Sequence, residues 1–176
     1  MTTLYGVLSE VLSIVWTLFV AIIIAAAIID VATYRIPHSL VLALIALFFV
    51  VALSHRNEVD WLSRLSAGII VFGAGILLYS IRQMGAGDVK LLSALALWAG
   101  MFALVPLLFF ISLCGLLGML VIVLLRMLVP RFLASTADKR ALPRVLTKGQ
   151  GIPYAVGIGP GAVIASFDFA PWLWQF

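Results

Sequence analysis

Residues 84–90 read Met-Gly-Ala-Gly-Asp-Val-Lys, and they interrupt a chain that is otherwise strongly apolar. An apolar segment ends just before them at Ile81, and no charged residue follows Lys90 until Arg126. Apolar stretches of this length predict membrane-spanning helices, because about 20 apolar residues suffice to cross the hydrocarbon core. A carboxylate at the start of such a helix is unfavourable, so Asp88 requires a specific role.

The composition predicts an all-α integral membrane protein. The 176 residues are 65% hydrophobic and only 10% charged, with a mean hydropathy of +1.25, whereas soluble domains are about 25% charged. Strand-like alternation is absent, which argues against a barrel. The single cysteine, Cys114, excludes an intrachain disulfide and a cysteine zinc cluster. We interpret the net charge of +4 as a topological signal rather than as a nucleic-acid-binding one.

The hydropathy pattern predicts one polytopic domain, residues 1–176, with about six transmembrane helices. The expected spans are residues 11–29, 39–53, 65–81, 88–100, a fifth ending near residue 129, and 154–167. Because residues 91–125 carry no charge, we expect a turn near Gly100 or Pro106. A helix from Asp88 to Gly100 is about 20 Å long, shorter than the ~30 Å hydrocarbon core, so Asp88 is expected below the membrane surface.

The distribution of cations predicts the topology. The loops after the first, third and fifth spans hold nine Lys and Arg residues, namely Arg35, Arg82, Lys90, Arg126, Arg131, Lys139, Arg140, Arg144 and Lys148. The opposite side holds only Arg56 and Arg64. The positive-inside rule therefore predicts cytoplasmic odd-numbered loops, including a basic loop at about 130–151, and termini that face outward. Asp30 and Asp88 both follow odd-numbered spans, so counting alone predicts that they lie at the same cytoplasmic face.

Two carboxylates in one low-dielectric site favour a state in which one keeps its proton and the other is charged. In that state the charged carboxylate takes a proton from water and the neutral one donates a hydrogen bond to a scissile carbonyl. Asp30 and Asp88 are therefore the candidate catalytic pair, with no metal or cofactor. We expect Gly85 and Gly87 to permit unusual backbone angles and to let a substrate backbone come close, and Lys90 to neutralise nearby charge or reach the headgroups.

The residues alone leave other interpretations open. Asp88 is also suited to capping a helix N-terminus, and Asp30 to an ordinary interfacial position. A small proton-coupled carrier with paired carboxylates is one alternative function, and a purely structural membrane subunit is another. His38 has no second ligand nearby in the sequence, which disfavours a metal site. The small residues Gly157 and Gly161 predict helix packing inside the bundle.

Several motifs resemble those of the type IV prepilin peptidases. Residues 85–92, Gly-Ala-Gly-Asp-Val-Lys-Leu-Leu, are similar to the GxGD signature of that family. Asp30 followed by Ile36, Pro37 and His38 resembles its first aspartate motif. Residues 98–100, Trp-Ala-Gly, and 151–154, Gly-Ile-Pro-Tyr, also resemble the family, so the likeness extends over about residues 22–164.

The resemblance implies an aspartic endopeptidase of the inner membrane that removes the short basic leader of prepilins or pseudopilins at the cytoplasmic face. It implies Asp30 and Asp88 as the catalytic residues, with Gly85, Gly87, Lys90, Ile36 and Pro37 supporting the loops around them. The expected partners are these substrates, membrane lipids and pilus-assembly components, and no nucleic acid.

The sequence departs from the family pattern in two respects. His38 stands where the family usually has Asn. Larger members carry a cytoplasmic insert with paired cysteines and also methylate the new N-terminus, and this chain lacks those cysteines. It resembles the short peptidase-only form that serves Flp/Tad-type pili, so we expect no methyltransferase activity.

Overall fold

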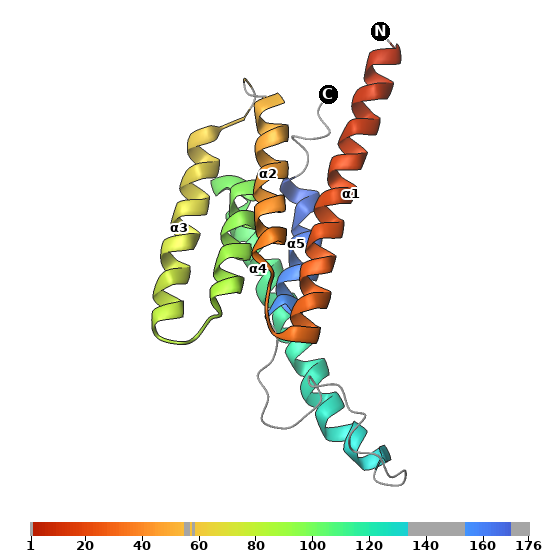
Figure 1. Cartoon of the computed structure of the whole chain (residues 1–176), viewed down its shortest axis with the longest axis vertical. Helices are drawn as coiled ribbons and strands as arrows, with labels where there is room; N and C mark the ends of the chain where they lie inside the picture. The colour runs from red at the N-terminus through yellow and green to blue at the C-terminus, as the bar shows by residue number, and fades with distance from the viewer. Residues whose placement is uncertain (1, 55–56, 58, 134–153, 170–176) are drawn as a thin grey trace.

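The computed structural model describes residues 2–54, 57, 59–133 and 154–169. Within these ranges the chain forms helices and no strands, which confirms the predicted all-α class. The helices are α1 (Thr2–Thr33), α2 (His38–Ser54), α3 (Trp61–Ser80), α4 (Ala86–Leu133) and α5 (Ala155–Phe169) (Figure 1). In the described part of the chain three segments are long and apolar enough to cross a membrane, Ser13–Thr33, Trp61–Ser80 and Ala86–Leu128, while α2 and α5 are shorter apolar helices.

Helix α4 reverses its direction at Gly100. This residue has φ 69° and ψ 179°, a region that is essentially restricted to glycine. Figure 1 shows a first arm, residues 86–99, beside α3, and a second arm, residues 101–133, returning past it. The turn expected near Gly100 or Pro106 therefore lies at Gly100. The six expected helical segments are present, but six membrane crossings and outward termini stay predictions.

Side chains of α3 bind the backbone groups that the reversal leaves free. The Arg64 guanidinium donates a hydrogen bond to the Trp98 carbonyl, and the Met101 amide donates to the Ser63 hydroxyl over 3.0 Å. Such partners are required in an apolar bundle, since an unpaired buried backbone group is strongly unfavourable. The reversal is thus built into the contact between α3 and α4.

Arg64 corrects one expectation. The sequence analysis placed residues 54–64 in a polar loop, whereas α3 begins at Trp61 and buries Arg64 to 9% exposure. The Asp60 side chain caps the helix by accepting a hydrogen bond from the Ser63 amide over 3.0 Å. An N-cap aspartate fixes a helix start without any apolar periodicity, which explains why hydropathy placed the start too late.

Trp98 connects three helices at the centre of the bundle. Its side chain is only 1% exposed, and its indole N–H donates to the Leu44 carbonyl of α2 over 3.0 Å. The ring centroid lies 4.9 Å from that of Phe19 on α1 and 5.7 Å from that of Phe48 on α2. The first arm of α4 is therefore anchored against both α1 and α2.

Helix α5 packs closely on the second arm of α4. A Cβ added at Gly157 would collide with the backbone of Gly115, and one at Gly161 would collide with the backbone of Ile111. Small residues at such positions let two membrane helices approach closely. The prediction that Gly157 and Gly161 serve packing inside the bundle is confirmed.

The chain between the first two helices also differs from expectation. We predicted a loop over residues 30–38, but α1 continues to Thr33, so Asp30 belongs to its last helical turn. No helix-breaking residue precedes Tyr34, and Pro37 then restricts the chain to an extended form before α2 begins. In the predicted basic loop at 130–151, residues up to Leu133 continue α4, and the remainder lies outside the described residues.

We predict that Gly100→Ala destabilises the fold by about 1–3 kcal/mol, because a Cβ is strained at this φ and would also lie 3.2 Å from the Ser63 hydroxyl. Unfolding in mixed detergent micelles measures the change. Gly73→Ala is the matched control, since its Cβ would meet no atom within 4 Å. Equal stability of the two variants would contradict the role assigned to Gly100.

Candidate active site

The candidate catalytic residues lie where helix ends gather. Figure 1 shows the last turns of α1 and α3 and the first turns of α2, α4 and α5 at the lower end of the bundle. A cavity of about 750 Å³ at this end is lined by residues 29–30, 33–38 and 85–88. It contains both Asp30 and Asp88, so the co-location predicted from counting spans is confirmed.

Asp30 is held by the start of α5. Its side chain is 6% exposed, and its Oδ2 accepts a hydrogen bond from the Ala155 amide over 3.2 Å. Ala155 is the first residue of α5, and the positive end of a helix dipole favours a carboxylate. The sequence analysis missed this donor because a main-chain amide has no side-chain signature. The one sequence feature that pointed to this region was the stretch 151–154, Gly-Ile-Pro-Tyr, which directly precedes Ala155 and resembles a motif of the prepilin peptidases.

Asp88 is held by its own helix. Its side chain is 8% exposed, and its carboxylate accepts a hydrogen bond from the Gly85 amide. Since α4 begins at Ala86, Asp88 occupies the third helical position and reaches back to the residue before the helix, as in half of a capping box. Asp88 is therefore not the N-cap residue itself, because it lies inside the helix, although its carboxylate does cap the helix start.

Both glycines of the motif provide space rather than unusual backbone angles. A Cβ at Gly85 would lie 2.7 Å from Asp88 Oδ2, and one at Gly87 would lie 3.1 Å from the Ile36 Cβ. Among the glycines that the structure describes, only Gly100 has a positive φ. The expectation of special backbone angles at Gly85 and Gly87 was therefore wrong, and the close approach of a substrate backbone to these glycines stays a prediction.

The other predicted support residues divide into two groups. Ile36 is buried against Gly87, and Pro37 lines the aspartate cavity. Lys90 is exposed and lines a neighbouring groove, not this cavity, so the structure does not bring it together with the two aspartates.

The two aspartates line the same cavity. Each is nearly fully buried and each is bound by a backbone amide from a helix start. This arrangement brings two acidic side chains to one small volume with limited access for water. Across the described ranges, no group of three or more His, Cys, Asp or Glu side chains is arranged to hold a metal ion.

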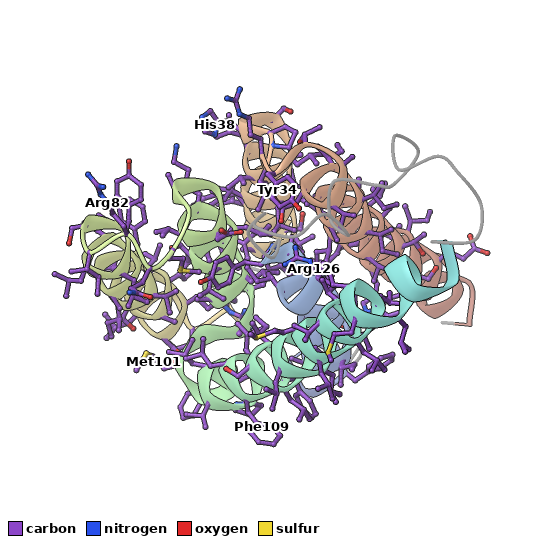
Figure 2. The ribbon with its side chains drawn as sticks, turned by 90° about the horizontal axis from the view of Figure 1, so that it is seen from below. Tyr34, His38, Arg82, Met101, Phe109 and Arg126 are labelled. Carbon is purple, nitrogen blue, oxygen red and sulfur yellow. The ribbon has the colours of Figure 1, made fainter. Side chains whose placement is uncertain are left out.

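Two tyrosines near the aspartates were not predicted. Tyr34 has a positive φ of 55°, its amide donates to the Asp30 carbonyl over 2.7 Å, and its buried hydroxyl has no hydrogen-bond partner among the described residues. Figure 2, seen from this end, labels Tyr34 near the middle of the bundle. The Tyr154 hydroxyl donates to the Gln83 carbonyl over 2.8 Å, which connects the start of α5 to the loop before the glycine motif.

Comparison with known proteins identifies one family for the chain. A model of the type IV leader peptidase family matches residues 17–123, more than half of the chain, and the matched range includes Asp30 and Asp88. No curated protein and no solved structure matches the chain. The long apolar helices and the family match together indicate a membrane peptidase. The chain therefore belongs to the type IV leader peptidase family.

Proposed function

We propose that this leader peptidase is an aspartic endopeptidase in which Asp30 and Asp88 activate water to cleave the short basic leader from prepilin-like proteins. The observation that carries the proposal is the cavity shared by the two buried carboxylates. Its volume of about 750 Å³ is in the ~300–1,000 Å³ range of ligand pockets.

The paired burial gives the two carboxylates complementary states. Two negative charges on buried side chains of one cavity repel each other, so one carboxyl keeps its proton while the other is ionised. The ionised group accepts a proton from water as the water attacks the scissile carbonyl. The protonated group donates a hydrogen bond to that carbonyl and stabilises the developing negative charge. The roles belong to the pair, because strongly interacting groups titrate together.

The backbone amides of Ala155 and Gly85 support this chemistry. Each holds one carboxylate in place from a different helix start. Preorganised donors of this kind keep the reacting groups in position without reorganisation during the reaction. The positions of Asp30 and Asp88 thus depend on α1, α4 and α5 at once.

The charge pattern supports cleavage at the cytoplasmic face of the inner membrane. Arg35 and Arg82 lie in the loops at the aspartate end of the bundle. By the positive-inside rule, an end rich in cations faces the cytoplasm. A prepilin-like protein presents its basic leader on that side before its apolar helix enters the membrane. The resemblance to the peptidase-only members of the family favours a peptidase of the Flp/Tad-pilus type.

We expect Asp30→Asn and Asp88→Asn each to lower the rate of leader cleavage by about 10²–10⁴-fold, because each removes one proton-transfer group. Processing of a co-expressed prepilin, followed by gel shift, measures the effect. Asp60→Asn is the matched control, because position 60 lies outside the cavity and asparagine is also able to cap α3. Near wild-type cleavage by either cavity variant would refute the catalytic pair, and a carrier or structural subunit would then be favoured.

A second prediction concerns the position of the Asp88 carboxylate. In Gly85→Ala the new Cβ would lie 2.7 Å from Asp88 Oδ2 and displace it. Since a misplacement of about 1 Å can reduce a rate about 10²-fold, we expect a similar loss of cleavage with little change in stability. Single-turnover cleavage and unfolding of the same preparation separate the two effects. Gly73→Ala serves as control, and unchanged cleavage by Gly85→Ala would show that the carboxylate position is unimportant.

The third prediction concerns the product. Purified protein incubated with a prepilin and S-adenosylmethionine should yield a processed N-terminus without a methyl group, since the chain resembles the peptidase-only form. Mass spectrometry of the new N-terminus distinguishes the two products. Methylated product made by the purified chain would overturn the peptidase-only assignment.

A further inference from the structure

A second cavity adjoins the aspartate cavity and differs from it in character. It measures about 540 Å³ and lies between α2, α3 and the first arm of α4. We call it the α2–α3 groove, with Gly68, Phe72, Ser93 and Leu97 among its lining residues. Its surface is almost entirely apolar, and the Ser93 hydroxyl is already used in a 2.7 Å hydrogen bond to the Val89 carbonyl of its own helix.

The groove is open because two helices are separated by a third. Helices α2 and α3 both pack on α4 but make little direct contact with each other in the described part of the chain. Figure 1 shows α3 and α2 on opposite sides of the first arm. Small residues, Gly68, Ser93 and Ala94, form part of the lining between them. Membrane helices approach one another most closely over small residues, so this surface fits a helix.

The groove meets the aspartate cavity at one end. His38 lines both cavities, and Lys90, which lines the groove, follows Asp88 by two residues. Figure 2 labels His38 towards the edge of the bundle and Tyr34, a residue of the aspartate cavity, closer to its middle. From Lys90 to Leu97 the first arm rises about 10 Å, so the groove extends for about two helical turns from the site into the apolar part of the bundle.

We propose that the α2–α3 groove binds the apolar helix of the substrate that directly follows the cleaved bond. This inference rests on the proposed function. A substrate chain that crosses the aspartate cavity in extended form meets the groove at His38 and continues along it as a helix. The charge of Lys90 at the entrance determines which side of the cleaved bond enters the groove. It repels the basic leader, so the uncharged segment that follows the bond binds there. The groove thereby contributes to affinity while the aspartate cavity performs the cleavage.

The test fills the groove and compares two substrates. A Cβ at Gly68 would make only ordinary contacts of 3.6 Å, so Gly68→Ala should be tolerated, whereas Gly68→Leu occupies the groove. The first substrate is a prepilin-like protein with its apolar helix, and the second is a soluble peptide that spans the cleavage site without the helix. Gly73→Leu is the control, because it lies on the same helix and its Cβ would meet no atom within 4 Å.

We expect Gly68→Leu to raise KM for the full-length substrate about tenfold with unchanged kcat, the loss expected when one large apolar side chain is excluded. Its kcat/KM for the short peptide should stay within about twofold of wild type, as should both values for Gly68→Ala and Gly73→Leu. An unchanged KM for the full-length substrate, or equal losses on both substrates, would overturn the groove assignment. If wild type cleaves neither substrate, the proposed function itself fails.

Crosslinking identifies the occupant independently of kinetics. A photo-crosslinking amino acid replaces either Ile69, which lines the groove, or Leu77, which lies elsewhere on α3. The two side chains are equally exposed, at 70% and 69%. Both variants also carry Asp88→Asn, so that the substrate is bound but not cleaved. We expect adducts with the substrate helix from position 69 and not from position 77. Adducts from position 69 with lipid alone, or with a second copy of the peptidase, would overturn the proposal.

Discussion

The reversal of the chain at Gly100 is the constraint on which the remaining structure depends. Because α4 folds back there, its second arm returns towards the aspartate end of the bundle. Helix α5 then packs on that arm through Gly115 and Gly157, which brings the Ala155 amide to Asp30. A single conformation available to glycine thus determines whether Asp30 has its hydrogen-bond donor. Arg64 and Ser63 make the reversal possible inside an apolar bundle by binding the backbone groups that it frees.

The site follows the same physical rule as the reversal. In an apolar bundle, water does not compensate buried polar groups, so the protein must provide partners. For Asp30 and Asp88 the partners are amides at helix starts, where the exposed N–H groups and the helix dipole both favour a carboxylate. Helix starts therefore bind the acidic groups while the side chains remain directed to a shared cavity. Repulsion between the two carboxylates is the unfavourable interaction that remains. In the proposed chemistry this repulsion keeps one carboxyl protonated and the other ionised.

The aspartate end of the bundle combines two kinds of surface. The cavity with Asp30 and Asp88 suits a polar, extended segment around a scissile bond, whereas the α2–α3 groove suits an apolar helix. His38 lies where the two surfaces meet. A substrate that changes from extended to helical at one point along its chain matches this division. Lys90 follows Asp88 by two residues but lines the groove and not the cavity, in keeping with the proposed division between cleavage and affinity.

The sequence by itself determined the helical class, a turn near Gly100 or Pro106, the internal packing of Gly157 and the meeting of Asp30 and Asp88, because apolar length and chain direction alone define which helix ends lie together. The structure decided between the two turn positions, since only Gly100 has the positive φ that the reversal needs. Hydropathy misplaced the start of α3 and the end of α1, since local capping and the backbone of Tyr34 set those positions. Only the tertiary structure revealed the Ala155 amide at Asp30, the use of Gly85 for space and the groove between α2 and α3. Those features arise from main-chain groups and gaps between distant helices, which have no side-chain pattern along the sequence.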